Sequence, residues 1–183
     1  MIVPTYTYTA SASAAIHCGV TVTFVDFQKD GNSITHMPEM DYDELEAAIT
    51  DKTKAIITMD LGGIVCDYDR IFEIVEWKFS LFKPLNDSSD PLSSLSSRMQ
   101  QFVGRVVIEA DCAHNLGASQ VVFRNGSGKL AQSIRKYCGG IADFPSFSFI
   151  GNNNRTGKNA EKRAKYGRII DQITQKLEIH KAA

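Results

Sequence analysis

The sequence predicts an α/β fold with a mostly parallel sheet and flanking helices. Segments with the apolar, β-branched pattern of buried strands alternate with segments that have the 3.6-residue apolar period of helices. Such alternation is typical of parallel sheets that helices cover on both faces. Because ligands of these sheets bind beyond the carboxyl ends of the strands, residues that follow a strand are the first candidates for a site.

Three strands and three helices are expected in the first 80 residues. The strands are 2–4, 20–27 and 54–60, and the helices are 10–19, 41–49 and 67–79. The first helix stops at Gly19, as helices commonly do. The second begins with Asp41 as its N-cap and has Glu44 three residues later, which predicts a capping box in its Asp variant. The apolar stripe of the third helix is Ile71, Ile74, Val75 and Phe79.

The segment "KPLNDSSDPLSSLSS" (83–97) is rich in Ser, Asp and Pro and predicts a surface insertion. Whether the overlapping "LSSLSSRMQQF" is helical is left open by its pattern. Further strands are expected at 105–111, in "GASQVVFRNGSGK" before a Gly-rich turn, and in "IADFPSFSFI". The first of these ends on a carboxylate, so Asp111 and the tip Ser146–Phe149 are the places to search for a site.

Composition bounds the class of protein. The chain has 183 residues, of which 43% are hydrophobic and 22% charged, as in an ordinary soluble globular domain. No apolar run approaches the ~20 residues that cross a bilayer. The four cysteines are scattered without a C-x-x-C pair, which disfavours a secreted disulfide scaffold. We therefore expect a cytoplasmic protein with reduced thiols and with neither a membrane nor a nucleic acid as partner.

The net charge of −1 hides an asymmetry along the chain. Up to Ile150 there are 12 basic and 18 acidic residues, whereas 8 basic and 3 acidic residues follow from Gly151 onward. This shift predicts a boundary, with one domain at 1–150 and a basic loop-plus-helix segment at 151–183. Within that segment one apolar stripe has helical spacing: Tyr166, Ile169, Ile170, Ile173 and Leu177.

The polar run "GNNNRTGKN" at this boundary is a candidate phosphate-binding loop. A Walker A loop needs four residues between its glycines and a Ser or Thr after its lysine. Here five residues separate Gly151 from Gly157, and Asn159 holds the hydroxyl position. A solvated linker is the favoured interpretation.

The stretch "EADCAHNLGA" (109–118) is a candidate for three chemistries. A metal site at Asp111, Cys112 and His114 is disfavoured because successive residues at a strand end point to different sides, so no metal site is expected. A Cys–His nucleophile pair lacks a third, orienting group. A carboxylate at the end of a strand suits pyridoxal phosphate (PLP) better, because it can pair with the protonated pyridine nitrogen. His114 could then reach the phenolic oxygen of the ring, and Tyr8 in "TYTYT" could stack on it.

Four blocks then resemble one family in consistent order. They are "IVPTYTYTASASAAIHCGVTVTFVD", "ITDKTKAIITMDLGGIVCDYDRIFEIVE", "EADCAHNLGAS" and "GGIADFPSFSF", and they run from Ile2 to about Phe149. The chain resembles the DegT/DnrJ/EryC1/StrS family of fold-type I PLP-dependent aminotransferases, many of which aminate keto groups of nucleotide-linked sugars. The resemblance implies a partial large domain, a PLP cofactor, and a nucleotide-sugar or amino-acid substrate.

Carried over residue by residue, the resemblance makes Tyr8 the aromatic that stacks on the cofactor and Asp111 the partner of the pyridine nitrogen. It places His114 near the ring oxygen and Ser148 at the phosphate. The Schiff-base lysine is expected five residues after Ser148, where the sequence has Asn153. An amide cannot form that bond or carry the amine's proton, so the sequence predicts no catalytic lysine there.

Further departures from the family shape the expected function. The upstream phosphate-binding segment and the closing C-terminal domain of the family have no counterpart in the sequence, and the surroundings of Lys158 match nothing in it. A hypothesis is that 151–183 arose by a frameshift or truncation junction. We expect an aminotransferase remnant that is inactive or very weakly active. The alternative is a non-catalytic interaction protein that docks on a partner, or on a second copy as a homodimer, through an exposed core edge and the C-terminal stripe.

Overall fold

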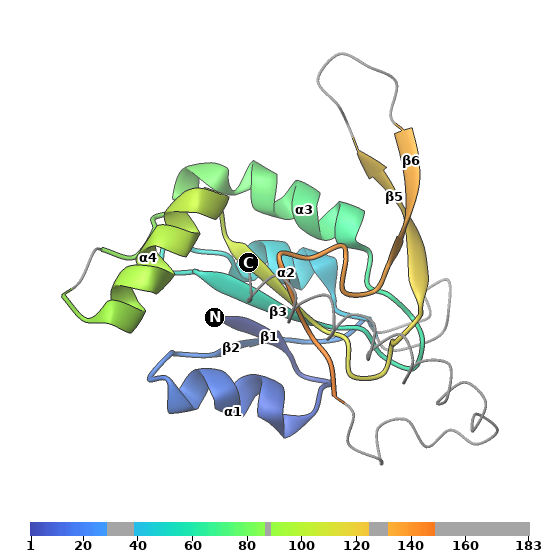
Figure 1. Ribbon diagram of the computed structural model, residues 1–183, viewed down its shortest axis with the longest axis horizontal. Coiled ribbons are helices and arrows are strands. Elements are labelled where there is room, and N and C mark those ends of the chain that lie inside the picture. The colour runs from blue at the N-terminus through green and yellow to red at the C-terminus, as the bar shows by residue number, and fades with distance from the viewer. Residues whose placement is uncertain (29–38, 87–88, 125–131, 149–183) are drawn as a thin grey trace, which may run out of the picture. The chain divides into compact units, whose positions relative to one another are not determined.

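The computed structural model describes residues 1–28, 39–86, 89–124 and 132–148. Its centre is a five-stranded sheet in the order β2-β1-β3-β4-β7, in which every pair of neighbours is parallel (Figure 1). The strands are β1 (Ile2–Pro4), β2 (Thr23–Val25), β3 (Ala55–Met59), β4 (Val107–Asp111) and β7 (Phe144–Ser146). Helices cover both faces of the sheet, which confirms the predicted α/β class.

The two faces are separated by the alternation of side chains along each strand. Ile2 of β1 and Ile56 of β3 belong to the large core on the side of α2 (Tyr42–Ala48) and α3 (Tyr68–Trp77). Val3 and Ile57, one position further along the same strands, lie on the other face with Ala12 of α1 (Thr9–His17). Figure 1 shows α1 on that second face, across the sheet from α2 and α3.

The helix termini follow the local sequence closely. The helix α1 ends at His17, and Gly19 then has φ 73°, a left-handed conformation that favours glycine. Asp41 caps α2 by accepting hydrogen bonds from the backbone N–H groups of Asp43 and Glu44. The reciprocal half of the predicted capping box is not formed, because Glu44 Oε2 accepts from the N–H of Asp26 at 2.9 Å instead. Glu44 therefore joins α2 to the end of β2.

The stripe predicted for α3 is confirmed in three of its four residues. Ile71, Ile74 and Val75 are buried, whereas the helix ends at Trp77 and Phe79 starts a short 3-10 turn (Phe79–Leu81). Phe79 is 60% exposed, so its inclusion in the stripe was wrong. The turn rotates its side chain away from the core face.

The predicted surface insertion is only partly a loop. It contains most of a helix, α4 (Pro91–Val103), whose first turn is capped by the Asp90 carboxylate accepting from the N–H of Ser93. Proline in the first turn and Gly104 in a left-handed C-cap complete its termini. The side chain of Ser97 is fully buried and donates to the carbonyl of Leu85, so Ser-rich composition concealed a helix that packs.

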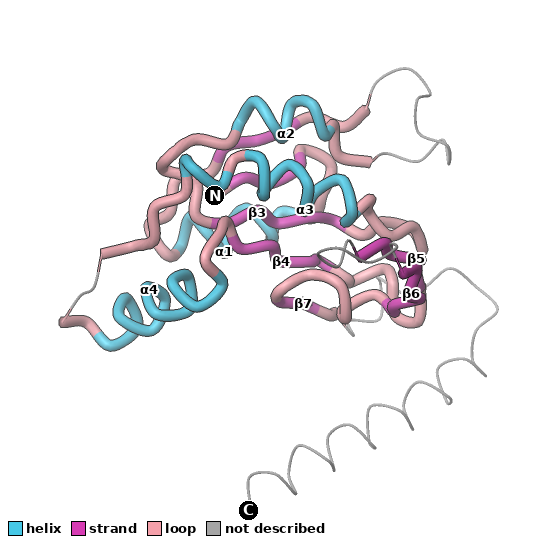
Figure 2. The backbone as a smooth tube through the Cα atoms, turned by 90° about the horizontal axis from the view of Figure 1, so that it is seen from above, coloured by secondary structure: helices cyan, strands magenta, loops and turns pink. Residues whose placement is uncertain are grey.

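A two-stranded antiparallel hairpin stands apart from the main sheet. Its strands are β5 (Ser119–Arg124) and β6 (Gln132–Tyr137). Figure 2 shows both strands at the opposite end of the described unit from α4. The sequence predicted β5 but missed β6, whose polar and apolar residues are intermixed. The carboxylate of Asp69 accepts from the N–H of Phe123 at 2.9 Å and so links the hairpin to α3.

An arginine–aspartate pair fixes the position of β7 beside β4. The two terminal guanidinium nitrogens of Arg105 each donate to the carboxylate of Asp143 at 2.8 Å, and the N–H of Ile108 donates to the same carboxylate. Fork-to-fork geometry adds directional specificity to an ion pair. The pair lies just before β7 and so sets the register in which Asp111 faces Ser146.

Among the residues that the structure describes, no helix is both long and apolar enough to span a bilayer.

Candidate functional site at the carboxyl ends of the strands

Asp111 is the last residue of β4 and points to the face that α1 covers. Its Oδ2 accepts a hydrogen bond from Ser11 Oγ at 2.9 Å, and its Oδ1 accepts from the N–H of Ala113 at 3.1 Å. The carboxylate is half-buried. Two donors on different segments therefore hold an anionic group in one orientation at the carboxyl end of a central strand.

The segment before α1 supplies the next part of the site. Tyr8 occupies the N-cap position, and its carbonyl accepts from the N–H of Ser11 at 3.0 Å. Ser11 is buried and also shares a hydrogen bond of 2.9 Å with the hydroxyl of Thr7. The Tyr8 ring is 71% exposed, and its side chain makes no capping bond. The exposed ring of Tyr8 thus lies about one helical turn before Ser11, the residue whose hydroxyl donates to Asp111.

His114 and Ser148 lie on the two segments that follow β4 and β7. His114 is half-buried on the turn directly after Ala113. Ser146 pairs with Asp111, and its carbonyl accepts from the N–H of Cys112 at 2.8 Å. Ser148 is half-buried two residues further on. The four predicted site residues that the structure describes, Tyr8, Asp111, His114 and Ser148, therefore lie at or just beyond the carboxyl ends of β1, β4 and β7. Asn153, Lys158 and the predicted boundary at residue 150 lie outside the described residues.

A second carboxylate shares the face of Asp111. Glu109 lies two residues earlier on β4, so it points to the same side of the sheet. Partial burial raises the pKa of Glu109, and the nearby Asp111 carboxylate raises it further. The face that carries the candidate site therefore has two neighbouring, half-buried carboxylates.

Asn115 is a structural residue of the site that sequence reasoning missed. Its side chain is fully buried, accepts from the N–H of Gly63 at 2.8 Å and donates to the carbonyl of Ile64. It thereby joins the turn after β4 to the turn after β3. Nothing local in the sequence distinguishes it from an exposed loop asparagine, because its partners are more than 50 positions away.

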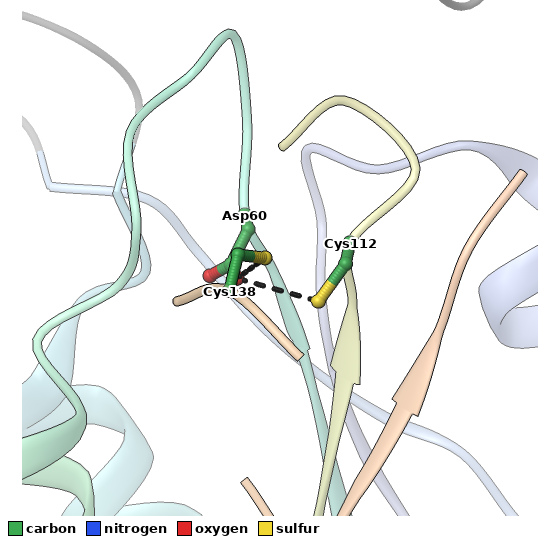
Figure 3. A group of neighbouring side chains, drawn as sticks. All are labelled: Asp60, Cys112 and Cys138. Carbon is green, nitrogen blue, oxygen red and sulfur yellow. Dashed lines mark hydrogen bonds between the residues drawn. The ribbon is translucent and has the colours of Figure 1, made fainter. Parts of the chain in front are cut away.

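Asp60, which follows β3, is a second missed residue and is fully buried. Its Oδ1 accepts from the N–H of Cys66 at 3.0 Å and from the Tyr68 hydroxyl at 3.1 Å. Its Oδ2 accepts from the thiols of Cys138 at 3.0 Å and Cys112 at 3.6 Å (Figure 3). The Cys112 thiol, burial and the Asp60 carboxylate each raise the pKa of the Cys138 thiol. The Cys138 thiol is therefore protonated near neutral pH and is no thiolate nucleophile.

The arrangement around Asp111 fits PLP. The cofactor's ring carries a cationic nitrogen, a face for stacking, a phenolic oxygen and a phosphate, and the chain offers a group of matching type for each. The decisive fit is the oriented, half-buried carboxylate of Asp111, since an anion there favours a protonated ring nitrogen. Cys112 points to the opposite side, toward Asp60, which is consistent with the expectation that neighbouring residues at this strand end diverge.

Comparison with known proteins identifies the family. The model of the DegT/DnrJ/EryC1/StrS aminotransferase family matches residues 1–82. A GDP-perosamine synthase from Escherichia coli O157:H7 is 30% identical over 186 residues, covering 99% of this chain and 39% of the relative. The chain belongs to the DegT/DnrJ/EryC1/StrS family. A GDP-perosamine synthase from Caulobacter vibrioides is 42% identical over 74 residues, which make up 40% of this chain and 18% of that relative.

A solved structure agrees with the family and the fold. Spr1654 from Streptococcus pneumoniae, assigned as a sugar aminotransferase, has a TM-score of 0.60 and 45% identity in its PLP form. The match covers 81% of this chain and 30% of Spr1654, and the PMP form of the same protein also matches. The chain is thus similar to a protein solved with PLP, and it spans well under half the length of these relatives.

Proposed function

We propose that this DegT/DnrJ/EryC1/StrS chain forms the PLP-binding sheet of an aminotransferase that acts on nucleotide-linked keto-sugars. The observation that carries the proposal is the Asp111 carboxylate, oriented by Ser11 and Ala113 at the end of β4. Support for the substrate class comes from the GDP-perosamine synthases and the sugar aminotransferase that this chain resembles. An amino acid, with glutamate as the first candidate, is the proposed amino donor.

Each site residue has one task in this proposal. When bound, PLP supplies the electron sink for the substrate carbon that gains or loses the amine. Asp111 would keep the proton on the ring nitrogen, and Ser11 orients the Asp111 carboxylate by donating to it. Tyr8 offers its exposed ring face for stacking. His114 binds the phenolic oxygen, and Ser148 donates to the phosphate.

The proposed activity of the chain by itself is weak or absent. Asn153 stands where the family pattern has the lysine, and its amide cannot move the proton between substrate atoms. Lys158, five residues later, is the nearest lysine after that position that could attach to the cofactor in its place. The unrelated origin of 151–183 also stays a proposal. The alignment with the E. coli relative covers 99% of the chain and so extends into 151–183, which is an argument against an unrelated origin. The coding DNA is the direct test: if the segment arose by a frameshift, another frame should restore a family-like sequence after residue 150.

Equilibrium binding of PLP tests the proposed function. The whole chain should bind PLP, and Asp111→Asn should weaken binding at least tenfold (about 1.4 kcal/mol), because a neutral amide no longer favours the protonated ring. The matched control is Asp43→Asn, an exposed aspartate on α2. Equal PLP affinity in the Asp111 variant and the natural chain would overturn the proposal.

Borohydride reduction distinguishes attached from unattached cofactor. Reduction followed by mass measurement should leave the chain unmodified if PLP binds only through the residues named above. If a modified chain is found and Lys158→Ala abolishes it, Lys158 is the attachment point and the expected weak activity must be revised upward.

A second candidate function, docking of a partner or a second copy, is favoured by apolar side chains on α4. Phe102 is 93% exposed and lines an open hollow with Leu95, Met99 and Phe144. Exposed apolar clusters are typical of interaction surfaces. Light scattering after size exclusion should give a mass that rises with concentration and falls back in Phe102→Ser. A monomer at every concentration would rule this function out for the isolated chain.

A further inference from the structure

The buried group of Asp60, Cys112 and Cys138 is unused by the proposed chemistry and unexplained by packing alone. Its three residues come from three segments: the end of β3, the end of β4 and the residue after β6 (Figure 3). One atom from each, a carboxylate oxygen and two sulfurs, lies within 4.8 Å of the others, and all three residues are buried. We propose that these residues bind a single zinc ion, which ties the hairpin to the main sheet beneath the cofactor site.

The distances fit tetrahedral coordination. Zinc–sulfur bonds near 2.3 Å and zinc–oxygen bonds near 2.1 Å place neighbouring ligand atoms about 3.6 Å apart at a tetrahedral angle. Asp60 Oδ2 lies 3.6 Å from Cys112 Sγ and 3.0 Å from Cys138 Sγ. Small side-chain shifts therefore suffice for a metal to enter between them. Thiolate sulfur with one carboxylate oxygen selects zinc over magnesium or calcium, which prefer oxygen alone.

The carboxylate is held as ligating carboxylates usually are. The N–H of Cys66 and the hydroxyl of Tyr68 both donate to Oδ1 of Asp60. This leaves Oδ2 directed at the two thiols, as in metal sites where outer hydrogen bonds orient the ligating atom. The Tyr68 hydroxyl is itself anchored by a bond of 2.9 Å to Thr58. All three ligands are buried, and with three protein ligands the fourth tetrahedral position would be filled by a small molecule such as water.

Charge also favours a cation at this position. Within the described part of the chain, Asp60 forms no ion pair with a lysine, arginine or histidine. A buried carboxylate without a cationic partner is costly. Zinc supplies that partner, and each thiol that ligates it releases its proton to solvent.

A disulfide between Cys112 and Cys138 is the competing use of the two thiols. Its formation would remove both sulfur-bound protons, and with them both donors to Oδ2 of Asp60. The buried carboxylate would then lose half of its hydrogen bonds and gain no cation. Zinc keeps all three groups engaged, so the geometry favours the metal over the oxidised pair.

Titration of the reduced, chelator-treated chain with Co²⁺ tests the site, because thiolate-bound cobalt gives a near-ultraviolet charge-transfer band that zinc displaces. We expect one Co²⁺ per chain. The band should disappear in Cys112→Ser and Cys138→Ser, and Asp60→Asn should lower Co²⁺ affinity by more than the ~10–100-fold that losing an outer hydrogen bond costs. Cys18→Ser, which alters the exposed cysteine, is the matched control and should leave the band unchanged.

A second measurement needs no variant and covers the case in which the substitutions prevent folding. Thiols of the natural chain are alkylated with and without Zn²⁺, and each modified cysteine is identified by mass spectrometry. Zinc should slow the reaction of Cys112 and Cys138 at least tenfold and leave Cys18 unaffected. A chain without a cobalt–thiolate band, equal alkylation with and without zinc, or a Cys112–Cys138 disulfide in the freshly purified protein would overturn the proposal.

Discussion

The two faces of the sheet are built for different purposes. Among the described residues, the face under α2 and α3 carries a core cluster of 19 buried apolar residues, whereas the cluster on the α1 face has three, Val3, Ala12 and Ile57. The thinly covered face holds the polar groups of the candidate site, including Asp111, and the densely covered face holds the hydrophobic side chains. The main hydrophobic core and the candidate site are therefore separated by which way a side chain points from the same strand.

The difference follows from the composition of the helices. The helix α1 is made of small and polar residues, so its backbone approaches the sheet closely and its serine reaches Asp111. The helices α2 and α3 bury larger side chains, among them Leu45, Ile71 and Tyr68. Small residues give access to a charged group, and large ones exclude water from the opposite face.

The largest effect is expected from a cavity in the dense face. Ile71→Ala should lower the free energy of unfolding by about 2–5 kcal/mol, because Ile71 is fully buried in the core between α3 and the sheet. Urea denaturation followed by circular dichroism measures the loss. The control is Ile16→Ala, the same substitution at a 56% exposed position of α1, which should change stability by less than ~0.5 kcal/mol. Comparable losses in both variants would contradict the division between faces.

Removing the link between α1 and Asp111 should have an intermediate effect. Ser11→Ala deletes a hydrogen bond to a carboxylate and leaves Thr7 without its partner, so we expect a loss of about 1–2 kcal/mol. If Asp111 holds PLP, the same change should also weaken PLP binding, since the carboxylate is no longer oriented. Ser13→Ala on the same helix is the control, because the Ser13 hydroxyl donates only to the carbonyl of Thr9. A Ser11 variant indistinguishable from the Ser13 variant in both measurements would remove Ser11 from the site.

The sequence predicted what depends on near neighbours. Gly19 as the end of α1 and Asp41 as the cap of α2 are decided within four residues, and both are confirmed. Asp111 was found because a strand pattern ends on it. By contrast, Asp60 and its thiol partners are separated by 52 and 78 positions, and no local pattern connects them.

The helix α4, which the sequence left open, and the strand β6, which it missed, have a related cause. The helix α4 is Ser-rich and exposes most of its apolar side chains, so it has neither the composition nor the clean stripe of a typical core helix. The strand β6 pairs with β5 in a separate two-stranded sheet, and pairing of this kind leaves a weak signal in one strand alone. In both cases the secondary structure depends on packing or pairing with another segment and not on the segment's own pattern.

The smallest effect concerns the charge of the thin face and is visible only in its pH dependence. Because burial and Asp111 raise the pKa of Glu109, the folded chain binds this proton more tightly than the unfolded chain does. Ionised Glu109 therefore reduces stability above its raised pKa, and this cost is relieved as pH falls through that pKa toward the ordinary value of 4.5. Glu109→Gln should melt slightly higher than the natural chain at pH 8, and the difference in melting temperature should shrink on acidification.

Glu76→Gln, at an exposed glutamate of α3, is the control for the general effect of removing one negative charge. If the two variants have the same melting profile against pH, the carboxylates on the α1 face are not coupled, and the negative character assigned to that face must be withdrawn.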